Sequence, residues 1–238
     1  MADGHEPPRT LRDDVIAGLR DIWPVMVAAA PIAGLCGALA VGKGLNVAEA
    51  GLMSIMVFAG GAQFAALEMW THPLPVAALV FSTLLINARH ILMGASLAPK
   101  LRRFSVLQRI AGMYVLTDEA WALAERRALK APVTPAYWFA LAAPLGVAWV
   151  ACTFLGAVLG SFLGDPRRVG ADFAFTALFI GLIAGFWNGR VAGATIAASG
   201  AVAAVVYATL GAPWHVVAGA FAGIAAAYLA APAEGAAR

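Results

Sequence analysis

The stretch STLLINARHILMGASL, residues 82–97, places an amide, a guanidinium and an imidazole inside an otherwise apolar run. These groups belong to Asn87, Arg89 and His90. An unpaired charge at membrane depth costs several kcal/mol, so the guanidinium needs a partner. Three partners are open: an acid such as Asp118 or Glu119, carbonyls freed at a broken helix, or the carboxylate of a substrate. A histidine beside it can exchange a proton near neutral pH. The pattern therefore predicts carboxylate binding by Arg89 and proton coupling by His90.

Polar groups lie on both sides of this run if it is a helix. Arg89 would lie about 15 Å from the basic end of the span, at 1.5 Å per residue. Polar groups on both sides imply contact with protein or water all round, so we expect this span to be central in the bundle. One face carries Thr83, Asn87, His90 and Gly94, and roughly the opposite side carries Ser82, Arg89 and Ser96.

Two further polar features accompany it. Gln63 follows the glycine pair Gly60 and Gly61 in the sequence FAGGAQF. Its amide can donate and accept, which suits an amino-acid headgroup, or it can bond to Asn87 between helices.

The adjacent carboxylates of Asp118 and Glu119 lie in YVLTDEAWALAERR. Three roles remain open for them. They can cap a helix together with Thr117, pair with the basic loop, or take part in proton coupling.

The composition of the chain indicates that these residues lie on membrane-spanning helices. The chain has 238 residues, of which 62% are hydrophobic and only 12% are charged, and its mean hydropathy is +0.81. Runs near the length of about 20 residues that a membrane helix needs occur seven times. We therefore expect an all-α integral membrane protein, a compact bundle of about seven transmembrane helices. The runs are 22–41, 48–70, 74–97, 137–163, 172–188, 191–210 and 213–230.

Residues 1–21 form a polar or amphipathic N-terminal segment, either an interfacial helix over 11–23 or a disordered tail. Residues 22–238 are predicted to form a single permease domain, with residues 98–136 as a basic loop carrying an amphipathic helix. Pro31 in the first span and Gly60 with Gly61 in the second predict helices broken near the midplane, which in transporters hold substrate or ions. The alternative is close packing by small residues.

Charge bias gives an orientation. Seven of the 16 lysines and arginines lie in residues 98–136, which the positive-inside rule places in the cytoplasm. Three spans then put the N-terminus outside, although that end also carries Arg9, Arg12 and Arg20.

Three stretches carry a family resemblance: MSIMVFAGGAQFAAL, INARHILMGASLAPKL and YVLTDEAWAL. In this order and spacing they resemble the AzlC family, large subunits of bacterial branched-chain amino-acid exporters, from about residue 31 to about residue 160. The resemblance implies a multi-pass permease of the bacterial inner membrane. It implies export of valine, leucine, isoleucine or methionine with the proton gradient, alongside a small AzlD-type membrane subunit. The positions it carries over are Gly60, Gln63, Asn87 and Arg89 for substrate, and His90, Asp118 and Glu119 for protons.

Other classes fit less well. Ser199 and His215 suggest an intramembrane serine protease, but on successive antiparallel spans they would lie at different depths. The chain has no HExxH zinc motif and no phosphate-binding loop, so no metal or other cofactor is expected. Its basic residues lie in loops, which argues against a nucleic-acid surface. A passive channel remains the third possibility.

Overall fold

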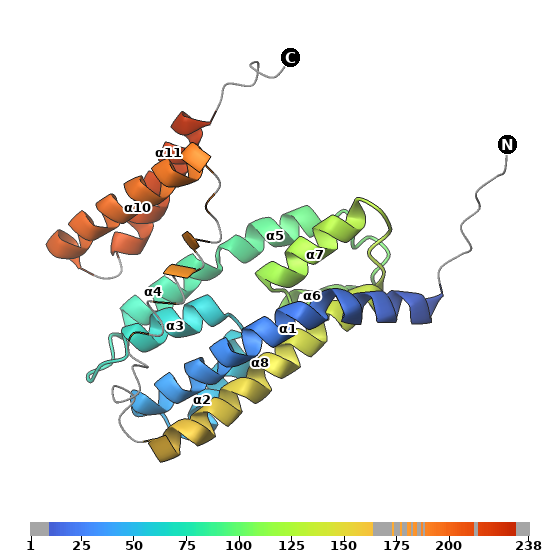
Figure 1. Ribbon diagram of the computed structural model, residues 1–238, viewed down its shortest axis with the longest axis horizontal. Helices are drawn as coiled ribbons and strands as arrows, with labels where there is room; N and C mark the ends of the chain where they lie inside the picture. Colours follow the sequence, from blue (N-terminus) through green and yellow to red (C-terminus); the bar gives the residue numbers. More distant parts are fainter. Residues whose placement is uncertain are drawn as a thin grey trace. The chain divides into compact units, whose positions relative to one another are not determined.

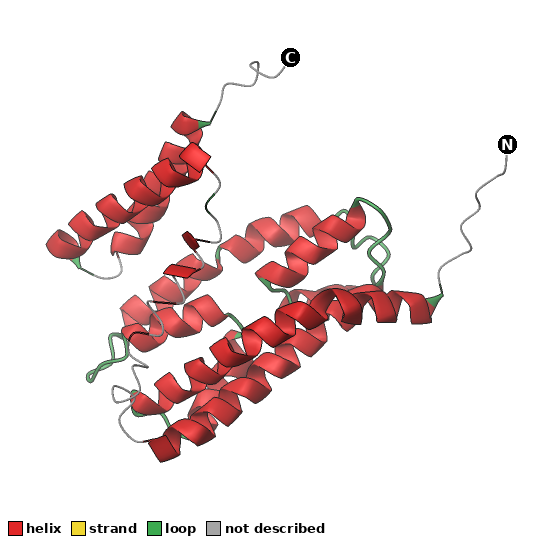
Figure 2. Ribbon diagram, in the orientation of Figure 1, coloured by secondary structure: helices red, strands yellow, loops and turns green. Residues whose placement is uncertain are grey.

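The computed structural model describes residues 10–163, 189–211 and 214–231, together with isolated residues between 173 and 187. The regular structure in these ranges is helical (Figure 2). Figure 1 labels the helices, which are α1 (Leu11–Gly42), α2 (Val47–Val57), α3 (Gly60–Glu68), α4 (Val76–Asn87), α5 (Arg89–Leu97), α6 (Val106–Tyr114), α7 (Asp118–Ala128), α8 (Pro135–Leu163), α10 (Gly189–Leu210) and α11 (Trp214–Ala230).

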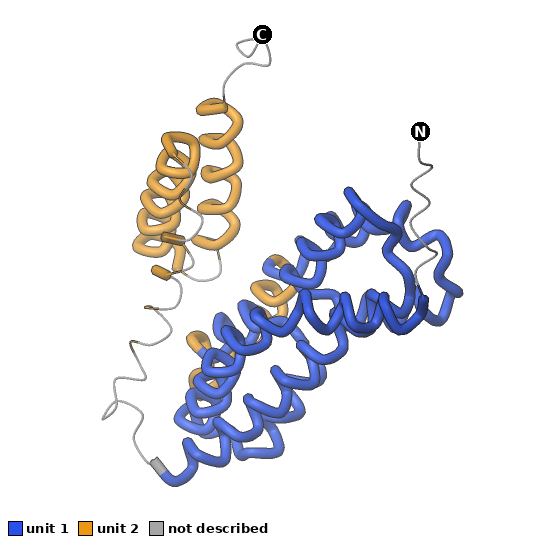
Figure 3. Tube along the Cα trace, turned by 45° about the vertical axis from the view of Figure 1, so that its right-hand side comes forward, with its two compact units in different colours: residues 1–67, 86–166 blue, residues 68–85, 167–238 orange. Residues whose placement is uncertain are grey.

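The chain divides into two compact units (Figure 3). Unit 1 comprises Met1–Leu67 and Ile86–Pro166. Unit 2 comprises Glu68–Leu85 and Arg167–Arg238. Whether residues 22–238 act as one permease domain stays a prediction.

The first helix begins where Thr10 and Asp13 form a capping box, each satisfying a backbone N–H of the other. It continues without interruption through Pro24 and Pro31 to Gly42. The expected break of this span near its middle is therefore wrong. Both prolines are exposed, and packing against α8 keeps α1 continuous despite the hydrogen bonds lost to proline. The segment 11–23 is the beginning of this same helix.

Glycines bring α1 and α8 into backbone contact. A Cβ on Gly18 would lie 2.6 Å from the carbonyl oxygen of Tyr137, and one on Gly37 would overlap the carbonyl of Thr153. Such contacts are typical of membrane helices that pack through small residues. Because Gly18 meets the beginning of α8 and Gly37 meets its second half, the two helices run parallel.

The second hydrophobic segment is broken near its middle, as the paired glycines predicted. α2 ends at Val57, and α3 begins at Gly60. The third segment has a single turn residue, Ala88, between α4 and α5, which the sequence did not predict. The segment 98–136 holds two helices, α6 and α7, where one amphipathic helix was expected.

The count of seven spans is not confirmed. In the part of the chain that the structure describes, four helices are long and apolar enough to cross a membrane. They are Leu11–Gly42, Val76–Leu97, Pro135–Phe162 and Gly189–Leu210. Val47–Val57 and Trp214–Ala230 are shorter apolar helices, and most of the expected span 172–188 lies outside the described residues.

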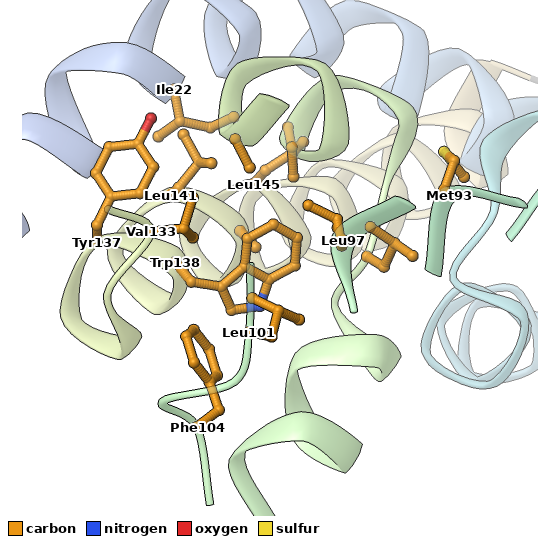
Figure 4. Packing of buried hydrophobic residues seen from close by; sticks show 14 residues of the cluster. Ile22, Met93, Leu97, Leu101, Phe104, Val133, Tyr137, Trp138, Leu141 and Leu145 are labelled. Carbon is orange, nitrogen blue, oxygen red and sulfur yellow. The ribbon is translucent and has the colours of Figure 1, made fainter. Parts of the chain in front are cut away.

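A buried hydrophobic cluster fixes residues 98–136 against the spans (Figure 4). Trp138 and Tyr137, at the beginning of α8, are fully buried. They belong to one cluster with Ile22 of α1 and with Leu97 and Leu101 at the end of α5. The first part of α1, the end of α5 and the beginning of α8 therefore meet at one end of unit 1.

Polar contacts at this same end change the expected orientation. Asp14 of α1 accepts hydrogen bonds from Arg127 and from Thr134, both at 2.7 Å, and Asp21 accepts one from Tyr137 at 2.7 Å. The beginning of α1 thus lies beside the basic segment. The prediction that three spans place these two regions on opposite sides is wrong, because Asp14 near the beginning of α1 contacts Arg127 of the basic segment directly.

In unit 2, α10 and α11 form an antiparallel pair around a turn at Gly211, whose φ is +74°. Cβ atoms on Gly219 and Gly223 would both contact Ser199. The glycines of α11 thus let α10 pack closely against it.

Candidate functional site

A pocket in unit 1 lies where the helix interruptions come together. Its cavity volume is about 60 Å³, enough for a few water molecules or a small polar group. Its lining comes from the α2–α3 break, the beginnings of α5 and α7, and the middle parts of α1 and α8. The lining residues are Ala29, Phe58, Ala59, Gly60, Arg89, His90, Thr117, Asp118, Glu119, Leu145, Gly146 and Trp149.

The pocket lies near the middle of α8. Leu145 is ten residues after Pro135, the first residue of the helix, and Trp149 is fourteen residues before Leu163, its last. At 1.5 Å per residue these separations are about 15 and 21 Å. The polar groups of the pocket are therefore held at depth by an apolar scaffold.

Arg89 and Asp118 form an ion pair across the pocket. Nη1 of Arg89 lies 2.5 Å from Oδ2 of Asp118, and the two side chains are 43% and 44% exposed. Of the three partners that the sequence allowed for Arg89, the structure shows the acid. Both groups remain accessible from the pocket, so a solute can reach either charge.

The beginning of α7 supplies the carboxylates. The hydroxyl of Thr117 accepts a hydrogen bond from the backbone N–H of Ala120 at 3.2 Å and caps the helix. Asp118 and Glu119 then lie in its first turn, where the helix dipole favours negative charge. Thr117 acts as the capping residue, while both carboxylates line the pocket.

His90 has a defined hydrogen-bond arrangement. Its Nδ1 lies 3.1 Å from the backbone carbonyl oxygen of Asn87. A carbonyl can only accept, so Nδ1 carries the proton of this bond. In the neutral ring Nε2 is then the nitrogen that carries no proton.

Gln63 and Asn87 lie outside the pocket lining. Gln63 is 1% exposed, and its Oε1 accepts a hydrogen bond of 2.9 Å from the indole N–H of Trp149, which does line the pocket. Among the described residues, Nε2 of Gln63 and Oδ1 of Asn87 are buried without a hydrogen-bond partner. A buried unpaired donor and acceptor are unusual, and both atoms can still form a hydrogen bond.

The two glycines before Gln63 have different surroundings. A Cβ on Gly60 would lie 2.6 Å from the ring of Trp149. One on Gly61 would lie 3.8 Å from Nη2 of Arg89, an ordinary contact distance. Gly60 is thus required for close packing of the α2–α3 break against α8.

Sequence reasoning missed the apolar part of the pocket. Phe58 was part of the motif FAGGAQF but carried no predicted role, and Leu145, Gly146 and Trp149 lie in a run whose sequence has no feature that separates them from other lipid-facing or packing residues. Only the fold places them opposite Arg89.

Ser199 and His215 are far apart along the α10–α11 pair. Ser199 lies against Gly219 and Gly223, whereas the ring of His215 lies 5.1 Å from that of Tyr207. Ser199 and Tyr207 are eight residues apart, about 12 Å along a helix. This geometry does not make a nucleophile–base pair.

These features define a multi-pass helical membrane protein with interrupted helices around a polar pocket. The chain belongs to the AzlC family, whose model, described as AzlC protein, matches residues 24–163.

Three relatives show the similarity. An uncharacterized membrane protein of Archaeoglobus fulgidus is 34% identical over 191 residues, covering 78% of this chain and 81% of the relative. The inner membrane protein YgaZ of Escherichia coli is 27% identical, covering 79% of this chain and 80% of the relative. The branched-chain amino acid transport protein AzlC of Bacillus subtilis is 28% identical, covering 57% of this chain and 53% of the relative. No solved structure matches the chain.

Proposed function

We propose that this protein is a secondary transporter that exports branched-chain or other hydrophobic amino acids. A membrane transport role is supported by membership of the AzlC family and by the similarity to the branched-chain amino acid transport protein AzlC of Bacillus subtilis. Helices long and apolar enough to cross a membrane agree with it. The Escherichia coli relative, named as an inner membrane protein, supports a place in the cytoplasmic membrane.

The observation that carries the proposal is the composition of the pocket. One part presents a cation and two carboxylates, from Arg89, Asp118 and Glu119, and another presents the apolar surfaces of Phe58 and Leu145. A hydrophobic amino acid needs both kinds of surface. Its ammonium and carboxylate match the charged part, and its side chain matches the apolar part.

The Arg89–Asp118 ion pair suits a zwitterion in particular. Separating the pair would leave two uncompensated charges at the depth of an apolar membrane scaffold, which is costly even for partly exposed groups. A zwitterion that enters between them supplies a carboxylate to Arg89 and an ammonium to Asp118, so no charge is left alone. A plain anion or cation replaces only one partner and is disfavoured by the same argument. Gln63 and Asn87 join the proposed site as a neighbouring layer, with Gly60 at the α2–α3 break.

Proton coupling is assigned to His90 together with Asp118 and Glu119. Nε2 of His90 carries no proton in the neutral ring, and Glu119 lines the same pocket and forms no ion pair with another described residue. A proton taken up by one of these groups changes the net charge of the pocket from which the zwitterion departs. The expected second component is a small AzlD-type membrane subunit.

Efflux from dipeptide-loaded cells tests the proposal. Cells that contain this chain and a small AzlD-type subunit should release the internally generated leucine, isoleucine or valine faster than cells that lack them. Dissipating the proton gradient should slow this release. Equal efflux from both cell types for all hydrophobic amino acids would reject the function. Trans-stimulated exchange would separate a carrier from a passive channel.

A further inference from the structure

We propose that Phe58 is the specificity-determining residue of the pocket, setting the size of the amino-acid side chain that it accepts. The inference rests on the proposed function and names the residue that forms its apolar boundary. Three independent features converge on this ring: the backbone conformation of Phe58, the glycine that it packs against, and a tyrosine that stacks on it.

Phe58 is held in an unusual backbone conformation. It ends α2 with φ +45° and ψ +34°, in the left-handed region, and its N–H donates to the carbonyl of Ser54 at 3.2 Å. A bulky residue with positive φ is a genuine outlier, because its Cβ meets the backbone there. Such strain persists only when the surroundings impose it, and it is concentrated at ligand sites. Glycine would serve this turn better, so the ring itself is needed.

Gly146 of α8 makes room for the ring. A Cβ on Gly146 would overlap Cζ of Phe58. The ring can therefore pack against α8 at this position only because residue 146 is a glycine. Both residues line the pocket. The ring therefore has no space to withdraw towards α8, and any larger residue at Gly146 would push it.

Tyr114, at the end of α6, fixes the ring from another side. The two aromatic rings are stacked, with centroids 5.3 Å apart and planes at 28°. The hydroxyl of Tyr114 donates to the backbone carbonyl of Ile55 in α2 at 2.7 Å. The tip of α2 is thus bound to the end of α6 by a stack and a hydrogen bond, and the Phe58 ring becomes a rigid wall.

A cavity of about 60 Å³ is small, so a rigid wall leaves no spare room beside the Phe58 ring for a larger side chain. In a close-fitting apolar site one methylene changes discrimination by about tenfold or more. Removing the ring should therefore admit larger side chains, and pushing the ring inward should exclude all but small ones.

The test measures counterflow of radiolabelled valine, leucine and phenylalanine in vesicles containing the full chain with its small subunit. In Phe58→Ala the ratio of phenylalanine to valine transport should rise about tenfold or more. Tyr114→Phe keeps the stack, loses the bond to Ile55 and should shift the ratio in the same direction by less. Met56→Ala, an exposed residue of α2, is the matched control and should keep the wild-type ratio.

A second arm uses Gly146→Ala, which should favour valine. Because this variant could fail to fold, it is paired with the double variant Phe58→Ala/Gly146→Ala, in which the new methyl has the space of the lost ring. Recovery of folded protein in the double variant, measured by size-exclusion chromatography in detergent, supports the contact. An unchanged phenylalanine-to-valine ratio in well-folded Phe58→Ala overturns the inference while leaving the proposed function intact. If the wild-type protein transports no amino acid, the proposed function itself fails.

Discussion

Arg89 is the residue on which the proposed chemistry depends most directly. It reaches Asp118 with one nitrogen, which leaves other donors of its planar guanidinium for a substrate carboxylate. Arg89→Lys keeps the charge but loses the two-pronged geometry. We expect normal expression and a substrate affinity about tenfold lower, equivalent to about 1.4 kcal/mol. Concentration dependence of counterflow measures it. Arg102→Lys, an exposed cation outside the pocket, should have no effect. An unchanged half-saturation concentration in Arg89→Lys would assign Arg89 a structural role.

Replacing His90 should affect coupling to the proton gradient without affecting substrate binding. The side-chain amide of a glutamine can replace Nδ1–H as donor to the carbonyl of Asn87, but it does not titrate. His90→Gln is therefore expected to reduce gradient-driven efflux while leaving substrate-for-substrate exchange near the wild-type rate. Both are measured in the same vesicles, with and without a pH difference. Equal loss of both activities would show that His90 serves packing or binding.

Phe58 also allows the strain in the backbone to be measured. Phe58→Ala and Phe58→Gly both remove the ring, so they lose the same contacts with Tyr114 and Gly146. Alanine still has a Cβ at φ +45°, whereas glycine adopts this conformation freely. The glycine variant should be more stable than the alanine variant by about 1 kcal/mol. Thermal unfolding in detergent gives the comparison, and an alanine variant of equal or higher stability would contradict it.

At the scale of elements, the parallel packing of α1 and α8 determines the path of the chain. Both helices cross the membrane in the same direction. Between Gly42 and Pro135 the chain must therefore make one net crossing in the opposite direction. Val76–Leu97 is the candidate span in this interval, and we infer from the chain order that it makes the return. α2 and α3, with 11 and 9 residues, are about 17 and 14 Å long, each about half of a 30 Å hydrocarbon core. We infer that they enter and leave the membrane on the same side.

Single cysteines test this path. In a chain whose native Cys36 and Cys152 are replaced by alanine, Lys43→Cys and Thr71→Cys should react with an impermeant thiol reagent from one side. Arg103→Cys and Lys130→Cys should react from the other, cytoplasmic side, where the basic residues lie. These four positions are exposed. Labelling of Lys43→Cys and Thr71→Cys from opposite sides would mean that α2 and α3 cross together as one broken span.

The segment α6–α7, like the segment α2–α3, consists of two short helices joined by a turn. Its end lies beside the first part of α1, where Arg127 forms an ion pair with Asp14 at 2.7 Å. Its turn carries Tyr114 to the carbonyl of Ile55 and Thr117 into the pocket. The pocket therefore lies where the turn of α6–α7 meets the break of α2–α3.

At the scale of the whole molecule, we expect transport to need a second, small membrane protein. The family resemblance motivates this expectation, as do the small residues that fill α10 and α11 and could accept another helix. Vesicles with this chain alone should show little gradient-driven efflux, and vesicles with both chains should show full efflux. Full efflux by this chain alone would contradict the prediction. Binding of labelled substrate to the isolated chain serves as the control that its pocket is formed.

The class of protein, and several of the polar residues that line the pocket, could be predicted from the sequence alone. Long apolar runs can be stable only as membrane helices, because hydrocarbon offers no partner for unpaired backbone groups. A guanidinium in such a run must find a partner, and the carboxylates at Asp118 and Glu119 were among the candidates. The glycine pair at Gly60 and Gly61 correctly indicated the break in the second segment, because glycine gives little support to a continuous helix.

The contacts between these segments could not be predicted from the sequence and are seen only in the fold. Pro31 does not break α1, because packing against α8 overrides a local helix-breaking preference. Hydropathy counts apolar residues and does not register which segments meet in the fold, so the N-terminal end and the basic segment were placed on opposite sides although Asp14 contacts Arg127. The apolar wall of the pocket, with Phe58 against Gly146 and Tyr114, joins three segments far apart in sequence. A contact of this kind depends on where helices pack, which the local pattern of residues does not encode.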